Sequence, residues 1–439
     1  MNHYSHLDMV LEEIKTRWGV PGLGVGIVEG GEIVHTMGFG VQSLATGIPI
    51  TPDSIFCVAS IAKCFVASAI MQLVEQGKLN LDVPIIEYLP EFKLDGQHFR
   101  FITLRQILSH TSGMPDMDET EYDVLVAHPE YDEEAPARYV HTLSTRKMIA
   151  LPGERFAYSN IAYNVLGYLI TRVTGLNFED YMRANILNPS GMPESTFAFP
   201  HVPPGRLAVP HIRTPEMVVN PIFPYHRADA PASFLYTTVI EMCHWAQISL
   251  NRGIYQGQRI LSPGSYDVMW KSIAQRGYPP FREEMGLGWA LGNFEGIKTV
   301  AHGGGGFGWT CHLILLPEIN SAAVILCNEE SSAITRFEDA VIGSIIGMEP
   351  QPGTVSWMIP VVKALQTGGM SAAYACYADI HNQPDFFFDP YELFTLVYQL
   401  LSVKKYELAL DVLKLNLYAF PGHQETTTLL VKFSKLKNP

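Results

Sequence analysis

The chain has 439 residues, of which 47% are hydrophobic and 17% are charged, and its formal net charge is −14. This composition is that of a globular protein with a large core, and it excludes a disordered chain. The acidic balance argues against a nucleic-acid surface, and no apolar run is long enough to span a membrane. We therefore predict no nucleic-acid partner and no membrane span.

The N-terminal segment predicts a helix followed by a hairpin. Apolar residues recur at helical spacing over 7–17, and two strand-like runs, 22–28 and 32–40, flank the turn at 29–31. Residues 1–15 lack the basic segment and apolar core of a secretory signal. The sequence thus predicts a cytoplasmic protein, although a chain with a trimmed signal would look the same.

A third element, a helix, is predicted to begin near Ser60 and to end at Gln76-Gly77. Ser60 and Lys63 are three residues apart, so both lie on one helix face. Lys63 stands in an almost wholly apolar stretch, where burial would lower its pKa toward that of a useful base. A serine hydroxyl needs such a neighbour to become a nucleophile. By itself, however, this spacing is more often a helix cap followed by a solvated lysine.

The cysteines show no C-x-x-C pair, which predicts buried free thiols in a reducing compartment. Two of them flank Ser60, but their apolar neighbours argue against a nucleophilic thiol. The six are Cys57, Cys64, Cys243, Cys311, Cys327 and Cys376.

Residues 78–225 predict helical pieces and proline-rich loops. We interpret 108–115 as scaffold, with His110 bonding the backbone locally. Tyr158 and Asn160 alternate about Ser159, so an extended segment would point them the same way. Tyr158 could act as a base if Lys63 lowered its pKa. The side-chain amide of Asn160 has both a donor and an acceptor, so it could hold a substrate carbonyl and Lys63. Alternatively, this segment is an ordinary entry to a helix with Asn160 as its cap.

Four strands are predicted at 287–291, 299–302, 310–316 and 322–327. His302 is followed by four glycines, which would let the backbone approach a ligand and complete an oxyanion hole. The glycines also match a dinucleotide-binding pattern, which we reject because a strand follows them instead of a helix. A metal site is not expected, because the histidines lack H-E-x-x-H or any paired spacing.

Strands at both ends with helices between them predict an α+β fold, an α/β sandwich. Its antiparallel sheet is closed by distant segments and flanked by helices. We predict a domain over 1–348, with a sheet subdomain at about 1–76 and 230–348 and an inserted, mainly helical subdomain at about 77–229.

A C-terminal helical extension is predicted over 349–439, after a change of composition at 349–353. Helices are expected at 389–403, 405–419 and 424–436. The stretch 406–421 resembles a tetratricopeptide repeat, but there is room for only one or two such units. A packed extension is favoured over a surface for a protein partner or a homo-oligomer.

Three motifs in order resemble those of the serine β-lactamase-like hydrolases: Ser60-x-x-Lys63, Tyr158-x-Asn160 and His302-x-Gly304. The branch that they resemble holds class C β-lactamases, penicillin-binding-protein relatives, esterases and D-aminopeptidases. The resemblance covers roughly residues 5–347.

The resemblance implies a role for each residue of the three motifs and no cofactor. Ser60 would attack a carbonyl and form an acyl-enzyme, while Lys63 and Tyr158 would share the proton transfers. Asn160, His302, Gly304 and Gly305 would bind the substrate. The N–H groups of Ser60 and Gly305 would form the oxyanion hole.

Two departures from the family pattern bear on the substrate. The third motif is His302-Gly303-Gly304 where lactam-hydrolysing members have Lys-Thr-Gly, and a bulkier Ala232-Ser233-Phe234 stands where relatives often have a glycine pair. A neutral histidine supplies less charge for a substrate carboxylate. We therefore expect a carboxylesterase with weak β-lactam turnover. The alternatives are a β-lactamase, a D-amino-acid peptidase or DD-carboxypeptidase, an acyltransferase, or a non-catalytic assembly protein.

Overall fold

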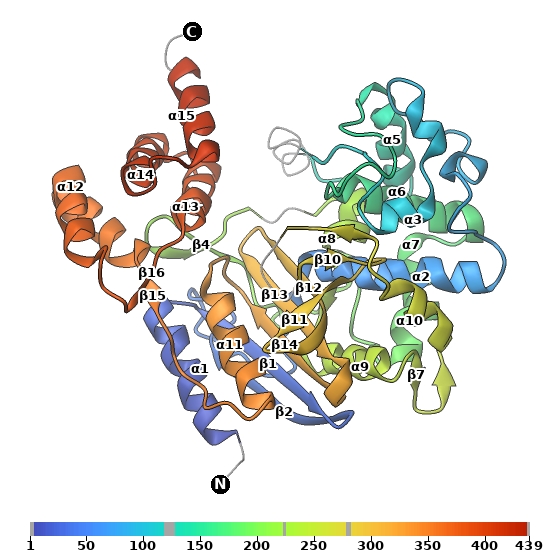
Figure 1. Cartoon of the computed structure of the whole chain (residues 1–439), viewed down its shortest axis with the longest axis horizontal. Coiled ribbons are helices and arrows are strands. Elements are labelled where there is room, and N and C mark those ends of the chain that lie inside the picture. The colour runs from blue at the N-terminus through green and yellow to red at the C-terminus, as the bar shows by residue number, and fades with distance from the viewer. Residues whose placement is uncertain (1–3, 118–127, 223–224, 278–281, 437–439) are drawn as a thin grey trace.

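The structure is a computed structural model that describes residues 4–117, 128–222, 225–277 and 282–436. Its centre is an eight-stranded antiparallel sheet with the strand order β2-β1-β14-β13-β12-β11-β10-β9 (Figure 1). The strands are β1 (Gly22–Glu29), β2 (Glu32–Gly40), β9 (Ala274–Gln275), β10 (Glu284–Met285), β11 (Ala290–Phe294), β12 (Ile297–Gly306), β13 (Trp309–Leu316) and β14 (Ser321–Cys327). Because β1 pairs with β14, distant segments close the sheet, as predicted.

Helices cover both faces of the sheet, which confirms the α+β sandwich. One face packs on α1 (Ser5–Trp18) and α11 (Ala333–Ile345), and the other packs on α9 (Val239–Leu250) (Figure 1). Successive side chains of a strand point to opposite faces of the sheet, so the sheet contributes to two hydrophobic cores. Val25 belongs to the core on the side of α1 and α11, and Val324 belongs to the core on the side of α9. At Gly26 the strand touches α9 closely: a Cβ there would lie 2.3 Å from the Sγ of Cys243.

One predicted strand is displaced from its expected place. We expected a strand at 287–291, but β11 begins only at Ala290. Gly288 has φ +76 and turns the chain instead, with its N–H donating to the Leu108 carbonyl at 2.9 Å. A Cβ at Gly288 would lie 2.5 Å from that of Ala67, so the turn packs directly on the helix that carries Lys63.

The middle of the chain supplies helices that surround α2 (Ala62–Glu75). They are α3 (Leu104–Leu108), α5 (Ala135–Thr142), α6 (Asn160–Thr174), α7 (Phe178–Met182), α8 (Ala230–Ser233) and α10 (Pro263–Met269). Short strands complete the region: β3 (Phe56–Cys57), β4 (His211–Arg213), β5 (Met217–Val219), β6 (Tyr236–Thr237), β7 (Ile254–Tyr255) and β8 (Gln258–Arg259). The domain boundaries given above stay predictions.

The C-terminal extension has its own core, centred on Trp357. Its helices are α12 (Met358–Ile380), kinked at Gly369, α13 (Pro390–Ser402), α14 (Tyr406–Ala419) and α15 (Gln424–Leu436) (Figure 1). The last three match the expected helices. A parallel pair, β15 (Val355–Ser356) and β16 (Phe386–Phe387), lies at its base.

Hydrogen bonds join the extension to the rest of the molecule. The Trp18 indole donates to the Thr354 carbonyl at 3.2 Å, and the Arg213 N–H donates to the Gln399 side chain at 2.9 Å. The ammonium of Lys405 donates to the Thr214 carbonyl at 2.6 Å. The extension is therefore packed on the main body, with α13 next to β4. No helix within the described residues is long and apolar enough to cross a membrane.

Candidate active site

Ser60 lies in a short 3-10 turn, Ala59–Ile61, that leads directly into α2. Ala59, a residue with a Cβ, has φ +46, a left-handed conformation that costs about 1–2 kcal/mol. Such strain persists only where the surroundings impose it, and it gathers at functional sites. Here the Val58 N–H is fixed by the Leu235 carbonyl at 2.9 Å. The strained turn presents the Ser60 hydroxyl to a cavity.

Lys63 is fully buried beneath Ser60. Its ammonium donates to the Ser60 hydroxyl at 2.9 Å, to the Asn160 side-chain oxygen at 2.8 Å and to the Ala232 carbonyl at 2.7 Å. Burial lowers the pKa of Lys63 to about 7, although the charges of Asp229 and Asp116 oppose that effect. A neutral amine keeps two donors and gains one lone pair. Lys63 could therefore hold Asn160 and Ala232 and still accept a proton from Ser60.

Asn160 begins α6 and is held by a carboxylate. Its backbone N–H donates to Asp116 at 2.8 Å, and its side-chain amide donates to the other oxygen of Asp116 at 3.1 Å. The cap of α6 is Ser159, which accepts from the Ala162 N–H at 3.1 Å. Asn160 is thus not the cap, and its side-chain oxygen faces Lys63. Nothing in the sequence around Asp116 singled it out.

Tyr158 joins the site through its hydroxyl, which lies close enough to the Ser60 side chain for Ser60 to lower the pKa of the phenol. The Lys63 nitrogen lies 5.0 Å from the centre of its ring, which stacks on His110 with centroids 4.1 Å apart. The expectation that Lys63 lowers the pKa of Tyr158 is wrong. Burial raises that pKa well above its usual value, and the charge of Arg276 offsets only part of the rise. Tyr158 is consequently a neutral phenol that can relay a proton.

His110 is fully buried and supports Tyr158 from behind. Its Nδ1 accepts from the Ser159 N–H at 3.1 Å, so this nitrogen carries no proton. Burial, followed by the charge of Lys63, lowers the pKa of His110 far below its normal value. A neutral ring that stacks and bonds backbone is structural, in line with the scaffold interpretation, but the backbone group lies 49 positions along the chain and is not local as expected.

The third motif lies on β12, which runs beside the Ser60 turn. A Cβ on Gly304 would lie 2.1 Å from the Val58 carbonyl and 3.0 Å from the Ser60 nitrogen, so only glycine permits this approach. Gly305 follows and lines the cavity next to Ser60. The strand was predicted to end at His302 but continues to Gly306. The glycines thus form the strand edge that faces the nucleophile.

His302 is buried and neutral. Its Nδ1 lies 2.7 Å from the Gly303 carbonyl, which fixes the proton on that nitrogen. Burial and the charges of Lys63 and Arg276 hold its pKa far below the usual range. A neutral imidazole stands where a charged lysine is common in the family motif.

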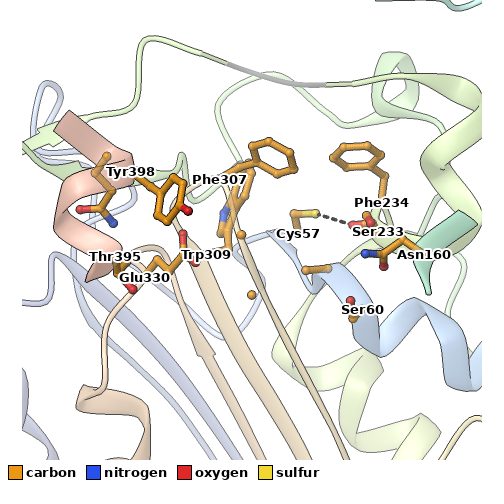
Figure 2. Close-up of a pocket in the computed structure, with 14 residues that line it drawn as sticks. Cys57, Ser60, Asn160, Ser233, Phe234, Phe307, Trp309, Glu330, Thr395 and Tyr398 are labelled. Atoms are coloured by element: carbon orange, nitrogen blue, oxygen red, sulfur yellow. Dashed lines mark hydrogen bonds between the residues drawn. The ribbon is translucent and has the colours of Figure 1, made fainter. Parts of the chain in front are cut away.

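A cavity of about 370 Å³ opens in front of Ser60 (Figure 2). Asn160 and Phe234 stand on the side of Ser60, while Tyr398 and Thr395 of α13 stand opposite. Phe234 and Phe307 stack across the opening with ring centroids 6.2 Å apart. Sequence reasoning did not place the extension in this cavity. The cavity is lined by Cys57, Ala59, Ser60, Asn160, Ser233, Phe234, Gly305, Gly306, Phe307, Trp309, Glu330, Thr395, Tyr398 and Gln399.

The two cysteines that flank Ser60 are poor nucleophiles. Both are buried, and burial raises the pKa of Cys57 to about 12 and that of Cys64 well above its normal value. The Cys57 thiol instead donates to the Ser233 carbonyl at 3.4 Å. All six cysteines are free, and five of them are buried as predicted, while Cys376 is partly exposed.

Asp229 is a second carboxylate near Lys63 that the sequence did not reveal. It is buried, and it accepts from the Asn164 side-chain amide at 2.7 Å. Burial raises the pKa of Asp229 to about 7, and the charge of Lys63 opposes the rise. Since each charge stabilises the other, Asp229 and Lys63 titrate as a pair.

A sheet closed by distant strands, with a serine hydrogen-bonded to a buried lysine at the start of a buried helix, is the arrangement of a serine hydrolase of the β-lactamase type. A family model described as Beta-lactamase matches residues 8–343. The chain belongs to this family.

Individual relatives are distant and vary in length. Penicillin-binding protein 4 from Amycolatopsis lactamdurans is 26% identical over 358 residues, which cover 79% of this chain and 91% of the relative. Protein flp from Staphylococcus aureus is 25% identical, with 78% of this chain and 66% of flp covered. The chain thus spans just under two thirds of flp.

Solved structures share the fold. The octameric penicillin-binding protein homologue from Pyrococcus abyssi has a TM-score of 0.67 and 26% identity, covering 82% of this chain and 80% of that one. The D-amino acid amidase from Ochrobactrum anthropi SV3 has a TM-score of 0.66 and 22% identity, covering 78% and 99%. A class C β-lactamase from Rhodobacter sphaeroides has a TM-score of 0.64 and 19% identity, covering 78% and 99%.

Proposed function

We propose that this protein is a serine hydrolase that forms an acyl-enzyme on Ser60 and prefers carboxylic esters. The observation that carries the proposal is the contact of 2.9 Å between the Lys63 amine and the Ser60 hydroxyl. Burial lowers the pKa of this amine to about 7, close to the pH at which a general base works best.

The mechanism follows from the contacts of the two side chains. Ser60 Oγ bonds to the substrate carbonyl carbon while its proton passes to the neutral Lys63 amine. The negative charge on the carbonyl oxygen is met by the N–H groups of Ser60 and Gly305, as in other oxyanion holes. The Tyr158 hydroxyl, which lies next to Ser60, relays the proton to the departing oxygen. Water then attacks the acyl-enzyme by the reverse route and regenerates Ser60.

The third motif supports esters as the substrate class. His302 is neutral and engaged with the Gly303 carbonyl, so it offers no fixed charge to a substrate carboxylate. Aromatic side chains, Phe234 and Phe307, flank the cavity mouth and suit an apolar acyl or leaving group.

The second candidate is hydrolysis of β-lactams or of D-amino-acid peptides and amides. Arg276 favours it, because its positive charge reaches both Tyr158 and His302 and could attract a substrate carboxylate. The names of the penicillin-binding and amidase relatives agree with this candidate.

An acyltransferase would use the same acyl-enzyme, and a non-catalytic assembly protein would use none. Homo-oligomeric assembly and a cytoplasmic location stay predictions.

Hydrolysis assays distinguish these candidates. Wild type and Ser60→Ala are compared with p-nitrophenyl acetate and butyrate, with nitrocefin, and with a peptide ending in D-Ala-D-Ala. We expect Ser60-dependent ester hydrolysis that exceeds nitrocefin and peptide turnover. Esterase activity equal in both proteins would exclude the ester proposal. A fluorophosphonate probe that fails to label Ser60 would favour the assembly protein.

A further inference from the structure

A second cavity, of about 320 Å³, adjoins the one in front of Ser60. The two cavities share four lining residues: Gly305, Glu330, Thr395 and Gln399. Gly305 lies on β12 beside the nucleophile, and Thr395 and Gln399 lie on α13 of the extension. A substrate seated at Ser60 therefore lies next to the second cavity, with α13 bordering both.

Carboxyl groups outnumber the cations that line the second cavity. Glu329 and Glu330 reach it from the segment after β14, and Glu392 reaches it from α13. Two cations also line it, but one of them, Arg282, is paired with the buried Glu338 at 2.9 Å. The Glu338 carboxylate also hydrogen-bonds the imidazole of His312, which lines the same cavity. The Arg282–His312–Glu338 trio is thus largely neutralised within itself.

The remaining cation is Arg213, whose charge acts on two of the three carboxyl groups, Glu329 and Glu392. One of its terminal nitrogens donates to the Trp18 carbonyl at 3.0 Å, which directs that part of the guanidinium toward the protein body. Arg213 also lowers the pKa of Glu329 and of Glu392, but burial outweighs this effect for both carboxyls. The second cavity therefore has more carboxyl groups than cations, and burial raises the pKa of Glu330 to about 7, so a bound cation would favour the ionised form of these carboxyls.

Glu392 provides independent evidence that a partner is missing. Its side chain lines the second cavity, the residue is 6% exposed, and within the described residues neither carboxylate oxygen accepts a well-formed hydrogen bond. Ser356 lies close enough to lower its pKa slightly, while burial raises that pKa to about 8. Glu329, 2% exposed, likewise has one oxygen without such a bond. Buried carboxyls without partners are costly, and a cationic ligand would remove that cost.

We propose that the second cavity is a substrate subsite that binds an ammonium or guanidinium group lying away from the reacting carbonyl. Such a group donates several hydrogen bonds, which Glu330 after β14 and Glu392 on α13 can accept. The aromatic mouth at Phe234 and Phe307 would hold the apolar segment between the carbonyl and the cation. The subsite rests on the proposed function, because it selects substrates for Ser60.

Two matched substrate sets test the subsite. The first is the p-nitrophenyl esters of hexanoic acid, 6-aminohexanoic acid and adipic acid, which share one chain length and differ in terminal charge. The second is phenyl acetate with and without a para-aminoethyl group, which moves the cation to the leaving group. Rates with Ser60→Ala are subtracted as the uncatalysed background. We expect kcat/KM to be at least tenfold higher for the ammonium member in one set.

Variants locate the effect. Glu330→Gln and Glu392→Gln should each reduce the ratio of ammonium to neutral kcat/KM severalfold, whereas Glu87→Gln, at an exposed glutamate, should keep it. A ratio near one in both sets, or a preference for the adipate ester, would overturn the subsite. Ser60-dependent acetate hydrolysis in the same experiment would still support the esterase, so the two failures are distinguishable.

A binding measurement keeps the subsite testable if no ester is hydrolysed. Thermal unfolding of the wild type is followed with rising 6-aminohexanamide and, separately, hexanamide. A saturable rise in melting temperature with the ammonium compound alone, abolished in Glu330→Gln, supports the subsite. Equal responses to both compounds, or none, would count against it.

Discussion

The two walls of the reaction pocket are built differently. The wall around Ser60 is held by short hydrogen bonds between side chains and backbone, with Lys63 bonded to Ser60, Asn160 and Ala232. The opposite wall comes from α13, part of an extension with its own core (Figure 1). We propose that the wall around Ser60, the near wall, sets the chemistry, and that the α13 wall, the far wall, sets the range of substrates. Substitutions on the two walls should therefore affect different kinetic quantities.

The largest effect is expected from removing the base on the near wall. Lys63→Met cannot accept the Ser60 proton, and general-base catalysis is worth about 100- to 10,000-fold. We expect kcat/KM for p-nitrophenyl acetate to fall at least 1000-fold. Lys63→Arg should fall similarly, because a guanidinium stays protonated. Thermal unfolding confirms that each variant is folded, and a folded Lys63→Met within tenfold of wild type would refute the assignment.

The next effect concerns the approach of β12 to Ser60. Gly304→Ala would bring a methyl group within 2.1 Å of the Val58 carbonyl, so the strand must move away and the oxyanion site must open. We expect a loss of about 100-fold in kcat, the scale of one lost oxyanion donor. In Gly305→Ala the new methyl would meet only the Trp309 carbonyl, at 3.8 Å. That variant retains its N–H and should lose less, so equal losses would contradict the geometry.

A smaller change is expected in the pH profile. With Lys63 as the base, kcat/KM should rise with pH through about 7 as its ammonium loses a proton. The Asp229 carboxylate raises the pKa of Lys63, so Asp229→Asn should lower that pKa. The rising limb should then move toward acid by about one pH unit, the lower end of the effect of a neighbouring opposite charge. Asp95→Asn, at an exposed site, should leave the limb in place. A shift toward alkaline pH would contradict the assignment.

The smallest effect is expected on the far wall. Tyr398→Ala would enlarge the pocket, and each additional buried CH2 group is worth about 0.8 kcal/mol, or roughly fourfold. The ratio of kcat/KM for p-nitrophenyl octanoate to that for the acetate should rise by about tenfold. Tyr406→Ala, at a tyrosine 51% exposed on α14, is the matched control. An unchanged ratio in Tyr398→Ala would mean that α13 does not contact the substrate.

The near wall was largely predictable because local patterns determine it. The spacing of Ser60 and Lys63 predicted that the two side chains meet, although Ser60 lies in the turn before α2 and not on the helix itself. The apolar neighbours of Lys63 already indicated its burial. The run of four glycines indicated a close backbone approach. Strand periodicity likewise predicted most of the sheet. It missed the short strands β9 and β10 and the end of β12, and at Gly288 a positive φ turns the chain before β11 begins.

The remaining features depend on tertiary contacts that leave no pattern in the sequence. Asp116 and Asp229 are single carboxylates, and only the fold brings them to Asn160 and Lys63. The pKa of Tyr158 depends on the balance between burial and nearby charge, which the motif does not contain. The extension reaches the pocket through a bond between residues 186 positions apart, Arg213 and Gln399, which helical periodicity cannot anticipate.

The central claim is that Ser60 becomes acylated, and intact-protein mass spectrometry tests it most directly. Wild type and Ser60→Ala are mixed with p-nitrophenyl butyrate and quenched in acid after seconds. The intact mass of each protein is measured, and the protein is then digested for peptide mapping. We predict that the wild type gains the mass of one butyryl group, on the peptide that contains Ser60, and that Ser60→Ala gains none. Equal labelling of both proteins, or a label on a peptide without Ser60, would contradict the account.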